Sequence, residues 1–303
     1  MSKIAVIIVS YNFERWMERC LGSLQRSSLK AEIIVVDNAS QDRTVPLLRS
    51  HYPEVYLIES HTNLGFGRAN NLGIARAMDQ GCRAVFLLNQ DAWVGERTLE
   101  TLLQLSARYP QYGILSPVHL TGRGNRLEAG FAAYAGLDRE AIAQADGEAT
   151  IRPVSFVNAA FWLIPLAVLK QVGGFCPLFY HYGEDVDYIN RVRFHGYIVG
   201  YSPAVTGCHD REERTVTHEA FLRSEQVYLL SEYANIRRPI IQAFAYGVLA
   251  GFKKAWKAIW GGRMADAVAF LRMTCRLVGR TGEVIHYRRQ NRLQAPSYIH
   301  SQS

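Results

Sequence analysis

The amino-terminal third of the chain alternates between short apolar runs and longer segments in which apolar positions recur at helical spacing. The apolar runs, which we interpret as buried strands, cover residues 4–9, 33–36, 55–58 and 84–88. The intervening segments are predicted helices at residues 14–26, 44–50 and 69–80. Strands and helices that alternate at this pitch are joined by right-handed crossovers, so the pattern predicts an α/β fold with a mostly parallel central sheet and flanking helices.

Each predicted strand ends in polar residues. These ends are Ser10-Tyr11-Asn12, Asp37-Asn38, His61-Thr62-Asn63 and Asn89-Gln90-Asp91. Open α/β sheets bind ligands outside the carboxyl ends of their strands, so the four ends predict a ligand crevice. A single acid after a strand is more often a turn residue or a helix cap, and Asp91 gains its weight from its neighbours.

A second polar cluster lies far along the chain, in residues 173–201. A Gly-Gly turn leads into an aromatic run and then into three carboxylates at a predicted helix start; the residues are Phe179, Tyr180, His181, Tyr182, Glu184, Asp185 and Asp187. Gly183 is the predicted N-cap, and acids in a first helical turn suit the positive end of the helix dipole. The alternative is that one carboxylate acts as a base at the mouth of a pocket walled by the aromatic rings.

The loop at residues 63–70 contains a G-x-G that differs from a dinucleotide-binding fingerprint. This loop follows the third strand and lacks the third glycine of the fingerprint. The fingerprint belongs after the first strand, which here ends in Ser10-Tyr11-Asn12 without any glycine. A Rossmann oxidoreductase is therefore not indicated. Glycines that lead into a helix amino terminus still suit an anionic group.

Five motifs, in order, carry a resemblance to a known family. They are VIIVSYN (6–12), IIVVDNAS (33–40), NLGFGRANN (63–71), FLLNQDAWV (86–94) and GGFCPLFYHYGEDVDYINR (173–191). With them the chain resembles inverting family-2 glycosyltransferases of the GT-A fold, in particular the bacterial rhamnosyltransferase-like members that build cell-surface polysaccharides. The resemblance spans roughly residues 3–235. It implies transfer of a sugar from a nucleotide-diphosphate donor, such as dTDP-rhamnose or a UDP-hexose, to a glycan or polyprenyl-linked acceptor.

The resemblance also implies roles for individual residues. Donor binding falls to Tyr11 and Asp37, for base and ribose, and to Asn38, Asn63, Arg68, Asn89 and Asp91. Asp91 ends the DXD-type motif and would bind Mg²⁺ or Mn²⁺, and His209 would complete the metal site. Asp185 would be the catalytic base, with Glu184 beside it. Asn89 replaces the first acid of the motif, which implies weak metal binding or none, and a hydrogen-bonded structural histidine is the other interpretation of His209.

The carboxyl-terminal region differs from the rest in charge. From Ile236 onward there are 12 Lys and Arg against Asp266 and Glu283, a balance of +10, whereas the whole chain is +7. A predicted helix over residues 240–260 collects its large apolar residues on one face and its lysines opposite, and residues 264–278 form a second amphipathic segment. The apolar positions are Ile241, Phe244, Val248, Phe252, Trp256 and Ile259, then Val268, Leu271, Cys275 and Val278; the lysines are Lys253, Lys254 and Lys257. This pattern favours an anionic membrane surface, and a helical hairpin packed on the catalytic domain is the alternative. No apolar run reaches the ~18 residues that span a bilayer.

These observations predict the domain organisation and setting. Residues 1–235 form the catalytic domain, with donor binding in about 1–95 and acceptor binding in about 96–235; residues 236–303 form a basic helical extension with a flexible end. Residues 120–150, rich in Gly and Ala, are expected to be an irregular connection. Five scattered cysteines and no signal-peptide pattern favour the reducing cytoplasm, with peripheral attachment at the inner face of the plasma membrane. No nucleic-acid module accompanies the basic charge, and self-association stays open.

Three functions from different classes remain. The first is an inverting glycosyltransferase of cell-surface glycan synthesis. The second is a non-catalytic relative that binds nucleotide-sugar or scaffolds a membrane assembly, which Asn89 favours and the intact Glu184-Asp185 pair opposes. The third is a sugar nucleotidyltransferase, which needs an early glycine- and arginine-rich phosphate loop that residues 10–16 lack.

Overall fold

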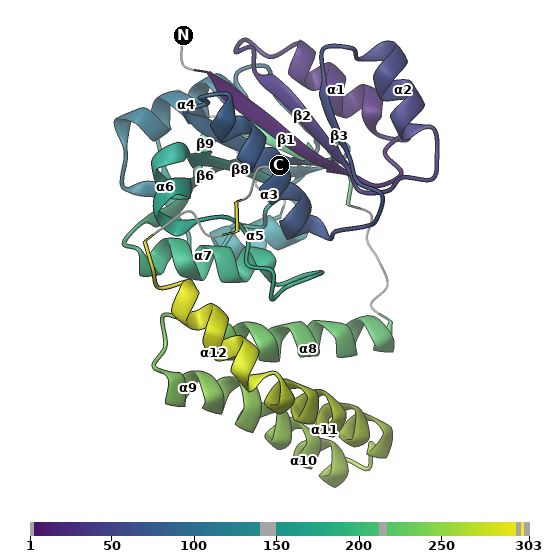
Figure 1. Ribbon diagram of the computed structural model, residues 1–303, viewed down its shortest axis with the longest axis vertical. Helices are drawn as coiled ribbons and strands as arrows, with labels where there is room; N and C mark the ends of the chain where they lie inside the picture. The colour runs from purple at the N-terminus through teal and green to yellow at the C-terminus, as the bar shows by residue number, and fades with distance from the viewer. Residues whose placement is uncertain (1–2, 140–149, 212–216, 295–297, 300–303) are drawn as a thin grey trace.

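The amino-terminal half forms the predicted alternation of strands and helices (Figure 1). A computed structural model describes residues 3–139, 150–211, 217–294 and 298–299. Its first elements are β1 (Ile4–Ser10), α1 (Met17–Gln25), β2 (Glu32–Asp37), α2 (Thr44–His51), β3 (Tyr56–Glu59), α3 (Phe66–Asp79) and β4 (Ala84–Asn89). Strands β1 to β4 pair in parallel, in the order β3-β2-β1-β4. The prediction of a parallel sheet with crossover helices is confirmed here.

The chain after β4 continues the same sheet with mixed pairing. Its elements are β5 (Ala92–Val94), α4 (Thr98–Arg108), β6 (Tyr112–Thr121), α5 (Ala129–Ala135), β7 (Arg152–Pro153), β8 (Phe161–Pro165), α6 (Leu166–Val172), α7 (Glu184–Phe194) and β9 (Ile198–His209). The full order is β3-β2-β1-β4-β8-β6-β9-β5, with β7 on β9, and β8 is antiparallel to both of its neighbours. The expectation of an irregular connection over residues 120–150 is wrong where α5 forms; residues 140–149 lie outside the described part.

Alternating side chains of the central strands feed two apolar layers, one on each face of the sheet. In β1, Ile4, Val6 and Ile8 contribute to one layer, and Ala5 and Ile7 contribute to the other. All five are fully buried, as expected for a strand covered on both faces. The cores therefore hold the carboxyl ends of the strands in a fixed arrangement at one edge.

The carboxyl-terminal helices form a separate layer below the sheet (Figure 1). They are α8 (His218–Ala234), α9 (Ile240–Phe244), a π-helical turn at Ala245–Leu249, α10 (Ala250–Trp260), α11 (Met264–Gly279) and α12 (Thr281–Gln290). A buried cluster joins α8 to this layer and to the segment before α7, through Leu229, Tyr233, Val248, Leu277 and Phe179 among others. The expected single helix over residues 240–260 is therefore interrupted by the π-helical turn, and α8 packs with the extension.

Two further features concern the end of the chain. Arg288 of α12 is buried and donates to the carbonyl oxygens of Tyr233, Asn235 and Arg238, which closes the carboxyl end of α8. Ile299 packs against the core of the sheet, and the Tyr298 hydroxyl donates to Asn291 Oδ1 at 2.8 Å. Among the described residues, no helix is long and apolar enough to cross a membrane.

Candidate active site

The polar strand ends meet at one edge of the sheet, as predicted. Ser10 lies opposite Asp37 in the β1–β2 register, and Val9 lies opposite Asn89 across β1–β4. Just beyond them, Tyr11 and Gln90 exchange two hydrogen bonds, one from the Tyr11 amide at 2.8 Å and one to its carbonyl at 3.0 Å. The loops after β1 and β4 are thereby fixed to each other, and the Tyr11 ring is left exposed.

Asp37 is buried at the end of β2, where neighbouring hydroxyl groups hold its carboxylate. Oδ1 accepts from the hydroxyls of Ser10, at 3.0 Å, and Ser40, and Oδ2 accepts from the Ser40 amide at 3.0 Å. Ala39 between them has φ 68°, a conformation that non-glycine residues adopt rarely. The β2 loop is therefore a rigid turn built around Asp37.

The loop before α3 is tied both to the β2 loop and to the aromatic run. Asn38 donates to Asn63 Oδ1 at 2.9 Å and accepts from the Leu64 amide at 2.7 Å. The Tyr180 hydroxyl donates to the carbonyl oxygen of Asn63 at 2.8 Å. Arg68 is exposed in the first turn of α3. It is close enough to Tyr287 of α12 for its positive charge to act on the Tyr287 hydroxyl.

The two glycines of this loop are explained by close packing. A Cβ at Gly65, which has φ 78°, would lie 2.2 Å from the carbonyl oxygen of Tyr180. A Cβ at Gly67 would lie 2.9 Å from Phe175 Cβ. Any side chain at these positions would push the loop before α3 away from the segment that leads to the acidic pair.

Asp91 and His209, which the sequence assigns to a metal, lie together. Strands β5 and β9 pair with Ala92 opposite His209, which brings His209 Nε2 to 3.2 Å from Asp91 Oδ1. Asn89 Nδ2 lies 3.5 Å from the same nitrogen. Although burial alone would lower it, the two adjacent carboxylates, Asp91 and Glu128, raise the pKa of His209 to about 9.

Glu128 is a member of this cluster that sequence reasoning missed. Its Oε2 lies 3.3 Å from His209 Nδ1 and 3.5 Å from His119 Nδ1, and His119 Nε2 lies 2.7 Å from the Ser116 hydroxyl. Burial would raise the pKa of Glu128, but its contacts with the two histidines hold that pKa well below its usual range. The sequence did not single it out, because Glu128 is one of five acids in the Gly- and Ala-rich residues 120–150.

The donor atoms of this cluster fit a weakly held hard cation. One carboxylate and one imidazole face each other, and the described residues hold no group of three or more His, Cys, Asp or Glu arranged as a metal site. Mg²⁺ in phosphate-transfer sites is commonly held by one or two carboxylates together with substrate phosphates and water. Asp91 and His209 thus suffice as protein ligands only if His209 loses a proton and a diphosphate supplies further oxygens.

The acidic pair lies at the amino terminus of α7, and Gly183 is its N-cap as predicted. Glu184 is buried, and its Oε2 has no hydrogen-bond partner within the described residues. Burial, and then the charge of Asp185, raise the pKa of Glu184 to about 7. Burial likewise raises the pKa of Asp185, whose Oδ1 accepts from the Val186 amide at 2.8 Å.

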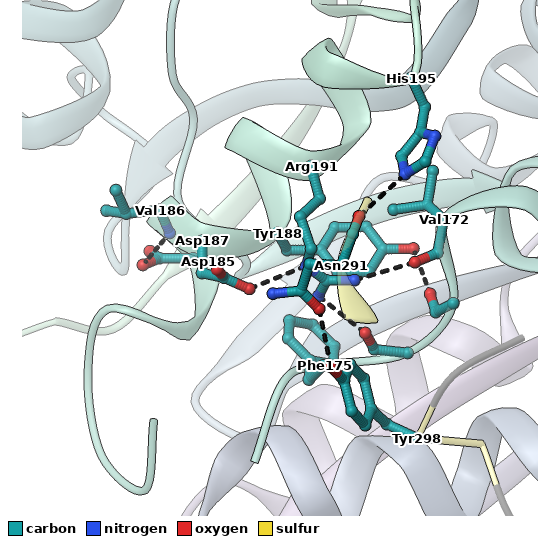
Figure 2. Close-up of polar contacts among 12 residues, drawn as sticks. Val172, Phe175, Asp185, Val186, Asp187, Tyr188, Arg191, His195, Asn291 and Tyr298 are labelled. Atoms are coloured by element: carbon teal, nitrogen blue, oxygen red, sulfur yellow. Dashed lines mark hydrogen bonds and ion pairs between the residues drawn. The ribbon is translucent and has the colours of Figure 1, made fainter. Parts of the chain in front are cut away.

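Arg191 anchors this helix from behind (Figure 2). Its guanidinium is fully buried and donates to Asp187 Oδ2 at 2.8 Å, to the Val172 carbonyl at 2.9 Å and to the Gly174 carbonyl at 2.7 Å. Asp187 therefore pairs with Arg191 one helical turn away. Because the same side chain holds the Gly-Gly turn, it fixes the position from which the aromatic run starts.

Arg211 and Tyr134 connect the acidic pair with the Asp91–His209–Glu128 cluster. Arg211 Nη1 lies 3.9 Å from Glu128 Oε1, and its positive charge also acts on Asp185. The negative charges of Asp185 and Glu128 both act on the Tyr134 hydroxyl. Asp185 is therefore coupled electrostatically to Glu128, which contacts His209 and through it Asp91.

Comparisons with known proteins concern the family and the fold of the chain. Residues 5–134 match the family described as glycosyl transferase family 2. An N-acetylglucosaminyl-diphospho-decaprenol L-rhamnosyltransferase of Mycobacterium tuberculosis is 27% identical over 237 residues, 70% of this chain and 77% of that protein. The low-salt glycan biosynthesis hexosyltransferase Agl10 of Haloferax volcanii is 27% identical over 235 residues, 76% of this chain and 73% of that protein.

Two solved structures share the fold. The mannosyltransferase PcManGT from Pyrobaculum calidifontis, in complex with GDP-Man and Mn²⁺, superposes with a TM-score of 0.58 at 20% identity, over 98% of this chain and 84% of that one. Residues 1–349 of S. aureus TarS superpose with a TM-score of 0.55 at 15% identity, over 98% and 89%. The family match over residues 5–134 and the rhamnosyl- and hexosyltransferase relatives, together with the motifs, support a family-2 glycosyltransferase, and the two solved structures share the fold of this chain.

Proposed function

We propose that this enzyme transfers a sugar, with inversion, from a nucleotide-diphosphate donor to a hydroxyl group of a glycan or lipid-linked acceptor. The single observation that carries the proposal is the convergence of two carboxylate sites. Asp185, at the start of α7, and the Asp91–His209–Glu128 cluster share Arg211 and Tyr134 as neighbours. A base beside a diphosphate-binding edge is the arrangement that this reaction needs.

Asp185 is the proposed catalytic base. An acceptor alcohol becomes a competent nucleophile when a base removes its proton during attack, which contributes about 10²–10⁴-fold. Burial raises the pKa of Asp185, which makes its carboxylate a better proton acceptor. The acceptor oxygen bonds to the anomeric carbon as the bond to the nucleotide diphosphate breaks, and a single displacement inverts that carbon. Glu184, buried beside Asp185, would shape the acceptor end of the site.

The donor would lie across the strand ends, held by Tyr11, Asp37, Asn38, Asn63, Arg68, Asn89 and Asp91. A rhamnosyltransferase and a hexosyltransferase are both relatives, so dTDP-rhamnose and UDP-hexoses are the first candidates. Asp91 and His209 would hold Mg²⁺ or Mn²⁺; such a cation stabilises the negative charge of the departing diphosphate. The GDP-Man and Mn²⁺ in the mannosyltransferase neighbour support this choice of ligand and metal.

The acceptor would be presented on a membrane. The mycobacterial relative is named for a substrate on decaprenyl diphosphate, which is a lipid. A polyprenyl-linked acceptor, with the enzyme peripheral at the cytoplasmic leaflet, fits the +10 balance of residues 236–303. This part of the proposal explains why a chain with an acidic catalytic domain has a basic extension.

A donor-binding screen tests the proposal. Full-length protein is titrated with dTDP-rhamnose, UDP-glucose, UDP-galactose and UDP-N-acetylglucosamine, in Mn²⁺ and in EDTA, and transfer or donor hydrolysis is followed. We expect one donor to bind in Mn²⁺, binding to weaken in EDTA, and Asp91→Ala to weaken it similarly, with a milder loss in His209→Ala. Binding without transfer or hydrolysis would favour the non-catalytic alternative, and donor affinity unchanged by both EDTA and Asp91→Ala would exclude the metal assignment.

A further inference from the structure

Helix α10 buries its small residues and exposes its large ones, and α11 exposes several large apolar residues although it buries Phe270 and Leu277. In α10 the buried residues are Gly251, Ala255 and Ala258, whereas Trp256 and Trp260 are 62% and 77% exposed. The exposed large apolar residues of the two helices are Phe252, Trp256, Ile259, Trp260, Met264, Val268, Leu271 and Val278. This distribution is the reverse of what a water-soluble hairpin adopts, and exposed apolar patches of this kind mark interaction sites.

The close packing of the two helices explains why the large residues point outward. A Cβ at Gly251 would lie 2.2 Å from Thr274 Oγ1, so the backbones approach closely at this point. Ala255, Ala258 and Ala267 fill the rest of the contact around Phe270. No side chain fits at the Gly251 position, and the alanines leave room for Phe270 as the one large side chain of this cluster.

The exposed apolar residues of the two helices lie on the same side of the hairpin. At about 100° per residue, the Phe252–Trp256–Ile259 stripe lies about a quarter turn from the buried face of α10, and the Val268–Leu271–Val278 stripe lies about a quarter turn, in the same sense, from that of α11. The turn at Gly261 and Gly262 makes the helices antiparallel, side by side at the end of the molecule far from the sheet (Figure 1). In an antiparallel pair, equal rotations bring the two stripes to one common face.

Positive charges flank this apolar face on both sides. Lys253 and Lys257 lie next to the stripe of α10, and Arg272 and Arg276 lie next to that of α11. All four are exposed, and none has an ion-pair partner among the described residues. Lys254, which points back toward α8, is instead paired with Glu225 at 2.5 Å. An apolar centre with Trp and Phe between two basic edges is the pattern of an interfacial membrane helix.

We propose that the α10–α11 hairpin lies flat in the surface of an anionic membrane, with its common apolar face in the acyl boundary and its four free cations among the headgroups. A second copy of the chain is a poorer occupant, because a symmetric contact would bring the basic edges of both copies together. This inference rests on the proposed function only for the purpose of the attachment, which is to hold the enzyme where a lipid-linked acceptor is presented.

Vesicle binding by full-length protein tests the inference. Vesicles of phosphatidylcholine with 30% phosphatidylglycerol, and of phosphatidylcholine alone, are sedimented with the protein at 50 and 300 mM salt, values we choose to span strong and weak screening at about 14 and 6 Å Debye length. We expect binding to the anionic vesicles at low salt, weakened by salt and by removal of phosphatidylglycerol. Lipids brominated along the acyl chain should quench the fluorescence of the wild type more than that of Trp256→Phe/Trp260→Phe.

Variants separate the two components of the surface. Trp256→Ala/Trp260→Ala and Lys253→Glu/Lys257→Glu should each weaken vesicle binding at least about tenfold. Lys30→Glu/Lys170→Glu, which makes the same charge change on the exposed surface of the catalytic domain, should bind as the wild type does. Donor binding should be unchanged in all three, so a loss of vesicle binding is distinguishable from a failure of the proposed activity. The inference would be overturned if the wild type did not bind anionic vesicles while still binding donor. It would also be overturned if the wild type formed a dimer that Trp256→Ala/Trp260→Ala abolishes.

Discussion

The sheet and the α10–α11 hairpin use their apolar residues in opposite ways. In the sheet, Trp162 and the large side chains of β1 are buried, and polar groups concentrate where the strands end. In the hairpin, Trp256 and Trp260 face outward and alanines fill the contact. Burial of apolar surface on folding stabilises the sheet by itself. Most of the apolar surface of the hairpin contributes no such free energy until a membrane or a partner protein covers it. The first region is thus built for internal rigidity around a reaction, and the second for attachment.

The largest effect should come from the rigid region. Asp185→Asn keeps the size of the side chain but removes the base, so transfer should fall about 10²–10⁴-fold while the donor dissociation constant stays within about twofold. Single-turnover transfer and donor titration measure the two quantities. The matched control is Asp187→Asn, which should lower the unfolding temperature through Arg191. Transfer within tenfold of wild type in Asp185→Asn would remove Asp185 from its role.

A pair of tryptophan substitutions compares the two regions directly. Trp162→Ala leaves a cavity in the core and should cost about 3–5 kcal/mol of unfolding free energy. Trp256→Ala should change it by less than about 0.5 kcal/mol in buffer, because that side chain is exposed. Urea unfolding of both variants provides the comparison. Similar losses would mean that the hairpin face is buried in the soluble protein.

The third effect concerns metal affinity. Glu128 accepts a hydrogen bond from Nδ1 of His209, which leaves Nε2 directed at Asp91, and removing such a partner typically costs about 10–100-fold in metal affinity. Glu128→Gln should therefore weaken Mn²⁺ binding in the presence of nucleotide diphosphate by about that factor. Calorimetry measures it, with Glu219→Gln on the surface of α8 as the control. Unchanged Mn²⁺ affinity would make Glu128 a purely structural link between the two histidines.

The smallest effect on donor affinity should come from the contact between the loop before α3 and the aromatic run at residues 179–182. Tyr180→Phe removes one hydrogen bond to the Asn63 carbonyl, worth about 1 kcal/mol, so donor affinity should fall about fivefold. Tyr182→Phe changes an exposed neighbour with no side-chain hydrogen bond among the described residues, and should leave donor affinity unchanged. Equal effects in both variants would show that the rings act through stacking rather than through the Asn63 contact.

Local sequence patterns were sufficient for the amino-terminal sheet and for the motif residues. Strands β1, β2 and β4 are continuous apolar runs between turn residues, so their ends and their common edge follow from the chain itself. The assignment of Gly183 as N-cap was equally local, because it depends on spacing within one helix. The sequence also indicated that Phe252, Trp256 and Ile259 share one stripe and Val268, Leu271 and Val278 another, but it wrongly placed Val248 in the first stripe.

Tertiary structure decided which face of each helix is covered and which distant groups meet. The phase of the helix after Ile240 changes at the π-helical turn, where a Cβ at Gly247 would lie 2.5 Å from Tyr233 Cβ, so Val248 is buried while Phe252 and Trp256 are exposed. Glu128 meets His209 because residues around both pair with β6, at a separation of 81 positions that no periodicity encodes. A sequence determines its own local periods and turns, because these depend on a few neighbouring residues. Burial and long-range contacts depend on how whole elements pack, and only the folded chain fixes them.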